Sequence, residues 1–142
     1  MRLNKIFISS DHAGFNLKKS IIQKFYKKQK IVDLGPISDK SVDYPDYAHK
    51  LSKKVSSNSR NFGILVCGSG TGMAISANKT KGIRAAVCYN AKSTRLSREH
   101  NNANIIALGS RLTKKSEAMK LIKIFINTKF EGGRHLRRVK KV

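Results

Sequence analysis

Short apolar segments alternate along the chain with segments in which apolar residues recur every three or four positions. The apolar segments have the length and the turn-residue boundaries of buried strands; they are residues 3–9, 31–34, 62–67, 84–88 and 105–108. The other spacing is that of amphipathic helices. It occurs at Leu17, Ile21, Ile22 and Phe25, at Ala48, Leu51 and Val55, and most clearly at Ala118, Leu121, Ile122, Phe125 and Ile126. Weaker helices are predicted over residues 73–80 and 91–101.

Strands that alternate with helices form βαβ units, in which the strands run parallel and helices cover both faces of the sheet. We therefore predict an α/β protein, a three-layer α/β/α sandwich around a five-stranded, parallel, Rossmann-like sheet. A length of 142 residues suits one domain, so residues 1–142 are expected to form a single domain that ends in a basic tail at 131–142. Such sheets bind ligands beyond the carboxyl ends of their strands.

The balance of charge restricts the class of partner. The chain has 30 Lys and Arg against 8 Asp and Glu, a formal net charge of +22, which attracts phosphorylated metabolites, nucleic acid or anionic membranes. The cations are spread over both halves of the chain, which is typical of a lysine-rich solvated surface. No apolar run approaches the roughly 20 residues that span a bilayer, and the first apolar stretch is too short for a signal peptide. We expect a cytoplasmic protein without nucleic-acid or membrane partners.

A glycine-rich segment, Cys67 to Gly72, follows the third predicted strand. Alternating glycines allow backbone N–H groups to converge on an anion where the next helix begins. The segment lacks the GK[ST] ending of a P-loop and the spacing of GxGxxG, which disfavours nucleotide binding. Two interpretations of the segment are kept: a cradle for an oxyanion or phosphate, and a plain strand-to-helix turn.

The two cysteines differ in their predicted surroundings. Cys67 begins the glycine-rich segment, where nearby N–H groups can lower the pKa of a thiol, so a reactive thiolate and an inert buried thiol both stay open. Cys88 lies inside an apolar predicted strand and is interpreted as a small core residue. Two cysteines without a CxxC pair disfavour redox chemistry. Four histidines without HxH or HExxH spacing predict no metal site.

Several polar residues lie at predicted strand or helix ends. Asp11 and His12 follow the first strand, where Asp11 is either a helix cap or a ligand for hydroxyl groups. His100 ends the fourth predicted helix, as a surface residue or as part of a site. The remaining candidates are Arg111, after the fifth strand, and the tail pair Arg134 and Arg138, which share a face if the tail is helical.

Six blocks of the sequence resemble the ribose-5-phosphate isomerase B family, which also includes isomerases of 6-phosphorylated allose and galactose. In family order and spacing, the blocks are SSDHAGFNLK, DYPDYA, GILVCGSGTGMAISANK, GIRAAVC, LSREHNNANIIALGSR and EGGRH. The resemblance implies interconversion of D-ribose 5-phosphate and D-ribulose 5-phosphate through an enediolate, in the non-oxidative pentose phosphate pathway, without metal or organic cofactor. It also implies a homodimer, assembled further into a tetramer in some members, with active sites shared between chains.

The resemblance also implies a role for each matching residue. Cys67 would be the base that moves a proton between carbons 1 and 2. Another branch uses a glutamate just after the glycine loop, where this chain has Met73, so the chain resembles the cysteine branch. His100 would donate the proton that assists ring opening. The residues that would contact the sugar, the enediolate oxygens or the phosphate are Asp11, His12, Gly68, Ser69, Gly70, Thr71, Gly72, Asn101, Arg111, Arg134 and Arg138, with Tyr44 as a pocket wall.

Two alternatives stay open. One is an isomerase of hexose 6-phosphates such as allose or galactose 6-phosphate, which would use the same base and loop. The other, from a different functional class, is a basic nucleic-acid or anion-binding module. The sequence has neither the aromatic stacking surface typical of single-strand binding nor a known DNA-reading motif, so the isomerase is favoured.

Overall fold

A five-stranded parallel sheet forms the centre of the protein in the computed structural model, which describes residues 5–28 and 30–142. The strand order is β2-β1-β3-β5-β4. The strands are β1 (Ile6–Ser10), β2 (Ile31–Asp33), β3 (Phe62–Cys67), β4 (Ala85–Val87) and β5 (Ile105–Gly109). The helices are α1 (Phe15–Phe25), α2 (Tyr44–Ser56), α3 (Thr71–Ala77), α4 (Ala91–Glu99), α5 (Lys115–Asn127) and α6 (Gly133–Val139).

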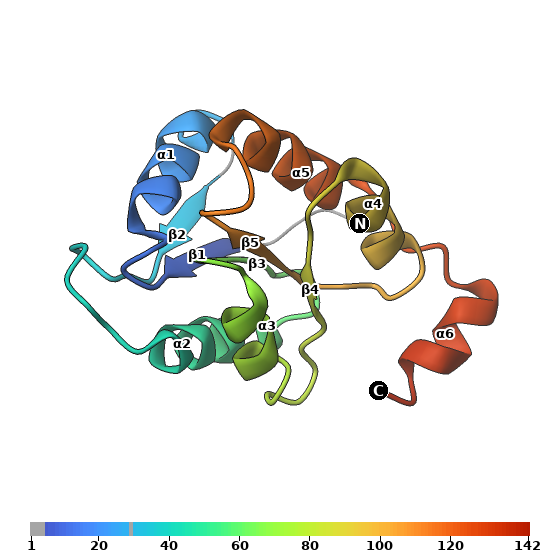
Figure 1. Ribbon diagram of the computed structural model, residues 1–142. Coiled ribbons are helices and arrows are strands. Elements are labelled where there is room, and N and C mark those ends of the chain that lie inside the picture. Colours follow the sequence, from blue (N-terminus) through green and yellow to red (C-terminus); the bar gives the residue numbers. More distant parts are fainter. Residues whose placement is uncertain (1–4, 29) are drawn as a thin grey trace.

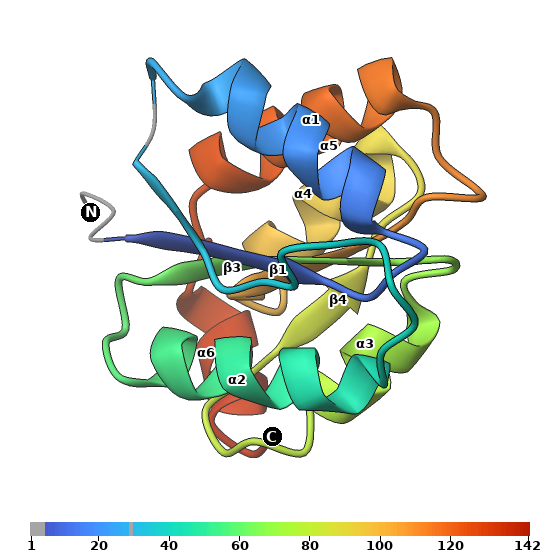
Figure 2. The same ribbon diagram turned by 90° about the vertical axis from the view of Figure 1, so that its left-hand side faces the viewer.

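Helices cover both faces of the sheet. Figures 1 and 2 show α1, α4 and α5 on one face and α2 and α3 on the other. This arrangement confirms the predicted three-layer α/β/α fold.

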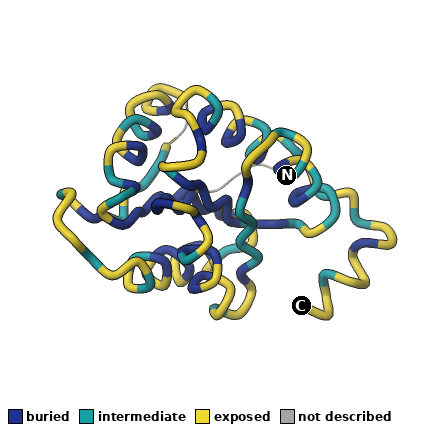
Figure 3. Tube along the Cα trace, viewed as in Figure 1, coloured by how far each residue is buried: buried dark blue, intermediate teal, exposed yellow. Residues whose placement is uncertain are grey.

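The central strands explain why their sequences are apolar without interruption. Successive side chains of a strand point to opposite faces, so Ile64 packs into a core with Phe125, whereas Leu65 packs into a core with Leu51. All six residues of β3 are buried, and Figure 3 shows the sheet as the most buried layer. No described helix is both long enough and apolar enough to cross a membrane.

The structure corrects several predicted boundaries. The strand predicted over 3–9 is described from Ile6 to Ser10, and residues 3 and 4 lie outside the described part. The helix predicted over 73–80 begins at Thr71 and ends at Ala77, because the Asn78 side chain exchanges hydrogen bonds of 2.7 and 3.0 Å with the backbone of Ala85. The helix predicted over 91–101 ends at Glu99.

The edge strands are also shorter than predicted. β2 and β4 have three residues each, so Asp33 ends a strand that was predicted to reach residue 34. Cys88 directly follows β4 instead of lying inside it, although it is buried as predicted. The tail, which was predicted only as a basic segment, contains α6.

Candidate functional site

Three loops meet at the carboxyl edge of the sheet, because β1, β3 and β5 are neighbours and run parallel. The backbone N–H of Asp11 donates to Val66 O at 3.1 Å, and that of Arg111 donates to Gly68 O at 3.0 Å. Ser110 Oγ donates to Ala13 O at 2.8 Å. The segments after the first, third and fifth strands are therefore joined into one surface, as the strand-end rule predicts.

The loop after β3 directs a backbone donor at the cysteine. Gly70 N–H donates to Cys67 Sγ at 3.1 Å, and the thiol is buried with 5% of its residue exposed. Gly70 has φ 82°, and a Cβ there would lie 3.1 Å from the carbonyl carbon of Leu108, so the turn requires glycine. A hydrogen bond from a backbone N–H stabilises a thiolate, which is the form able to accept a proton.

Other residues of the predicted site surround this loop. Ser69 is exposed, and its Oγ accepts from Thr71 N at 3.2 Å. A Cβ on Gly72 would lie 2.9 Å from the ring of Tyr44, which places that ring against the loop as predicted. The Arg111 guanidinium lies over Gly68, where an added Cβ would be 2.8 Å from Nη1.

Asp11 and His12 hold two further segments at the same edge. Asp11 Oδ1 accepts from Gly14 N at 2.9 Å, which fixes the turn that leads into α1. The N-cap position of α1 is Gly14 and no side chain caps it, so Asp11 is not the predicted helix cap. His12 Nδ1 accepts from Val42 N at 3.2 Å, which joins β1 to the β2–α2 connection. That bond leaves Nε2 of the neutral imidazole as the nitrogen that carries the proton.

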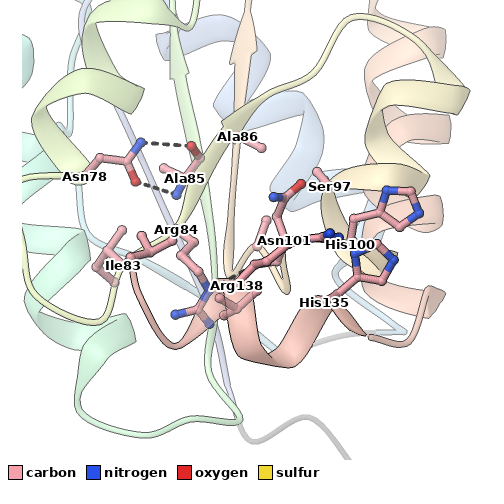
Figure 4. A pocket seen from close by; sticks show the side chains of 13 residues that line it. Asn78, Ile83, Arg84, Ala85, Ala86, Ser97, His100, Asn101, His135 and Arg138 are labelled. Carbon is pink, nitrogen blue, oxygen red and sulfur yellow. Dashed lines mark hydrogen bonds between the residues drawn. The ribbon is translucent and has the colours of Figure 1, made fainter. Parts of the chain in front are cut away.

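The other predicted residues lie along β4 and the amino edge of the sheet. His100, Asn101 and Arg138 line a cavity of about 400 Å³, which Figure 4 shows between the end of α4 and α6. Arg134 lies beside it, with Nε 3.5 Å from Nε2 of His135. Both arginines belong to α6, which meets the condition on which they were expected to share a helix face.

His135, which was not predicted as a site residue, forms part of this cavity. Its ring stacks on His100, with centroids 4.2 Å apart and planes inclined by 12°. Its Nε2 is 3.4 Å from a carboxylate oxygen of Glu131. Desolvation lowers the pKa of His135, and the charges of His100, Arg134 and Arg138 lower it further, against the opposing effect of Glu131.

His100, Glu131 and His135 place possible metal-ligand atoms within 4.8 Å of one another. Lone pairs of imidazole nitrogens lie in the plane of the ring, so two stacked rings direct them along separate planes and not toward one point. The arrangement therefore favours a contact between the rings over chelation of an ion. That the site works without a metal remains a prediction.

The two groups of residues do not meet within one chain. Cys67 and Gly109 end neighbouring strands, whereas His100 precedes β5 at its opposite end. A strand of five residues extends roughly 13 Å between its first and last residues. Figure 1 shows the arrowheads of β1 and β2 on the left and α6 on the right. The chain thus separates the predicted site residues into two groups, one at each edge of its sheet.

Sequence reasoning missed His135 because the tail has the composition of a solvated basic segment. One signal was present in the sequence. Glu131 and His135 are four residues apart, as are Arg134 and Arg138, which is the spacing of side chains on one face of a helix.

Comparisons with known proteins agree with the resemblance. Residues 6–142 match the family model described as Ribose/Galactose Isomerase. The chain is 46% identical over 140 residues to a probable ribose-5-phosphate isomerase B of Mycoplasma genitalium, covering 96% of this chain and 92% of that protein. It is 38% identical over 141 residues to ribose-5-phosphate isomerase B of Escherichia coli, covering 99% of this chain and 95% of that protein.

Solved structures show the same likeness. Ribose-5-phosphate isomerase B of Clostridium thermocellum has a TM-score of 0.94 at 45% identity, covering 97% of this chain and 94% of the other. The Mycoplasma genitalium enzyme, solved with bound ribulose-5-phosphate, has a TM-score of 0.92 at 46% identity. The match covers 96% of this chain and 92% of the other. This chain belongs to the ribose/galactose isomerase family.

Proposed function

We propose that the protein interconverts D-ribose 5-phosphate and D-ribulose 5-phosphate, as a step of the non-oxidative pentose phosphate pathway. The observation that carries this proposal is the Cys67 sulfur, held 3.1 Å from the Gly70 N–H in a glycine loop. The chain shares a family with the Mycoplasma genitalium enzyme solved with ribulose-5-phosphate. Such a loop suits the enediolate of an aldose–ketose isomerisation.

The Cys67 thiolate removes the proton from carbon 2 of the open-chain aldose. The electron pair moves to form the enediolate, and a proton is returned to carbon 1 while the hydroxyl proton passes from oxygen 2 to oxygen 1. Backbone donors of residues 68–72 stabilise the developing oxyanion. Loss of one such donor typically costs ~3 kcal/mol, on the order of a hundredfold in rate.

The remaining residues open the ring and hold the substrate. His100 donates a proton to the ring oxygen as the bond between that oxygen and carbon 1 breaks, and the carbon-1 hydroxyl gives up its proton to water to become the aldehyde. Asp11, His12 and Asn101 contact hydroxyl groups. Arg111, Arg134 and Arg138 bind the phosphate, since a guanidinium fork matches its oxygens. Phosphate binding, remote from the reacting carbons, positions them for proton transfer.

A complete site requires two chains. Cys67 and Arg111 lie at one edge of the sheet, while His100 and the α6 arginines lie at the other. In a symmetric dimer, each edge of one protomer can face the opposite edge of its partner. We therefore propose a homodimer with two shared sites, and further assembly to a tetramer is compatible with it.

The reaction is tested by proton NMR of ribose 5-phosphate in deuterium oxide, with wild-type protein and the Cys67→Ala and Cys88→Ala variants. Wild type is expected to form ribulose 5-phosphate, and Cys67→Ala to lose about 10²–10⁴-fold in rate, the usual contribution of a general base. Cys88→Ala, the matched control, should keep the activity. Full activity of Cys67→Ala would place the base elsewhere.

The same assay separates the substrate alternatives. Allose 6-phosphate and galactose 6-phosphate are to be compared with ribose 5-phosphate at equal concentration. Faster conversion of a hexose phosphate would keep the reaction and change the substrate. Dialysis against EDTA is expected to leave the rate unchanged, because no step of the proposed mechanism uses a metal.

A further inference from the structure

The turn between α4 and β5, which carries His100 and Asn101, is held by two arginine side chains. Arg98 Nη1 donates to Ala103 O at 2.6 Å and to Asn102 Oδ1 at 3.1 Å. Arg84 Nε donates to the carbonyl oxygens of Asn101 at 3.1 Å and Asn102 at 3.0 Å. The two guanidinium groups therefore bind consecutive parts of one turn.

The backbone of the turn has one left-handed residue. Asn102 has φ 47°, a conformation that asparagine adopts more readily than other residues except glycine. Arg84 and Arg98 together donate hydrogen bonds to both the backbone and the side chain of this residue. These bonds select the one conformation that leads from α4 into β5 with His100 at its start.

Arg98 also fixes the turn to the segment that leads to α6. Its Nε donates to Thr128 O at 3.1 Å, and the backbone N–H of Glu131 donates to Glu99 O at 3.1 Å. The stack of His100 on His135 depends on the relative position of these two segments. Arg98 thus joins the two parts of the chain that form the cavity.

The interior position of Arg98 is unusual for a cation. Only 5% of the residue is exposed. Within the part of the chain that the structure describes, its guanidinium donates hydrogen bonds to carbonyl and amide oxygens and lies over the rings of Phe62 and Phe125, at 4.5 and 5.5 Å. Burial lowers the pKa of Arg98 to about 10, with a further contribution from the charge of Arg84. A buried charge without a carboxylate carries a desolvation cost, so packing alone does not explain it.

We propose that Arg84 and Arg98 are positioning residues for ring opening, which act by fixing the 100–103 turn so that His100 meets the ring oxygen of the substrate. The inference rests on the proposed isomerase function. Arg98 is too buried to contact substrate, and Arg84 reaches the turn from the cavity side, as Figure 4 shows. The proton transfer at Cys67 is assigned to the thiolate and the glycine loop, and neither arginine has a part in that step.

The chemistry of the ketose allows ring opening to be separated from proton transfer. Ribulose 5-phosphate cannot close a five-membered ring, because its carbon-5 oxygen carries the phosphate, and it therefore enters the site as an open chain. Removal of a proton from its carbon 1 requires only the Cys67 base and the glycine loop. Exchange of that hydrogen with deuterium oxide reports proton transfer alone, whereas turnover of ribose 5-phosphate also requires ring opening.

The experiment measures both rates for Arg98→Met, Arg84→Met, His100→Ala and the wild type. The methionines keep the unbranched apolar part of the side chain and remove the guanidinium donors. A displacement of His100 by about 1 Å is expected to lower ribose 5-phosphate turnover roughly 10- to 100-fold, while carbon-1 exchange stays within about twofold of wild type. Arg95→Met, an exposed arginine of the same helix, is the matched control and should change neither rate.

The outcomes distinguish this inference from the proposed function. Wild-type protein that neither converts nor exchanges its substrate would refute the isomerase itself. With an active wild type, selective loss of turnover in the arginine variants, as in His100→Ala, supports the positioning role. Equal loss of both rates, unchanged turnover, or a higher KM at unchanged kcat would overturn it. Arg84→Met, at a half-buried position, provides the test if Arg98→Met does not fold.

Discussion

Two residues of the glycine loop, Gly68 and Gly70, are glycines for different physical reasons. At Gly70, φ is positive and an added Cβ would meet the backbone of β5. At Gly68, the nearest atom to an added Cβ is Nη1 of Arg111, the end of a flexible side chain. Backbone cannot move aside, whereas a side chain can.

We therefore predict that Gly70→Ala lowers both stability and activity, because strain at such a position costs about 1–3 kcal/mol and the donor to Cys67 is displaced. Gly68→Ala should keep the fold but move Arg111, which raises KM for the sugar phosphate. Urea unfolding and steady-state kinetics measure the two effects. An equal loss of stability in both variants would contradict this explanation.

At the scale of single residues, the sequence made Cys67 a candidate because a cysteine before alternating glycines is a local pattern. The Gly70 N–H bond to its sulfur confirms the predicted convergence of a backbone donor on this residue. His135, Arg84 and Arg98 were missed, because their importance depends on contacts between segments distant in sequence. Arg98, for example, contacts Thr128, thirty positions away.

Among the secondary-structure elements, α1 is joined to β2 by an ion pair between a buried lysine and an exposed aspartate. Lys18 Nζ lies 2.8 Å from Asp33 Oδ1 and also donates to Pro36 O at 2.6 Å. The lysine is 1% exposed, but the aspartate side chain is 43% exposed. Removal of the aspartate therefore leaves a buried positive charge, whereas removal of the lysine leaves a negative charge that water can reach.

Asp33→Ala leaves the buried ammonium of Lys18 without its counter-ion, and we predict a loss of about 3–5 kcal/mol of stability. Lys18→Met leaves an exposed carboxylate that water can solvate, so the loss comes mainly from the unpaired Pro36 carbonyl, about 1–3 kcal/mol. The free energy of unfolding in urea measures both. A greater loss for Lys18→Met would contradict this order.

The elements themselves were largely predictable from the sequence. Buried parallel strands such as β3 are apolar throughout, and helices such as α5 have one apolar face, so both patterns are strong. Element ends were less predictable, because side chains such as Asn78 fix them through bonds to another element. α6 was missed because it is short and exposes most of its residues.

For the whole molecule, the main finding is the separation of the predicted site into two halves. The sequence blocks show which residues match the family. The edge of the sheet that each residue occupies follows from whether it comes after a strand or before one, because all the strands run parallel. The fold places Cys67 and the glycine loop at the carboxyl edge and His100 with α6 at the other. We infer that residues 1–142 act as one domain whose basic tail completes the site of a partner chain.

The excess of positive charge is also a property of the whole molecule. Exposed cations on several elements create a field that attracts a phosphorylated substrate. Its contribution to the rate decreases as salt is added, because the Debye length shortens. The charge excess thus adds to substrate capture without locating the site.

Mixing two inactive variants tests the shared site most directly. Cys67→Ala and His100→Ala are unfolded together, refolded as a mixture and assayed for ribose 5-phosphate isomerisation. Half of randomly formed dimers contain one chain of each kind, and in a shared arrangement one of their two sites is intact, giving about a quarter of wild-type activity. If Cys67 and His100 of the same chain formed each site, every site would lack one residue and the mixture would stay as inactive as its components.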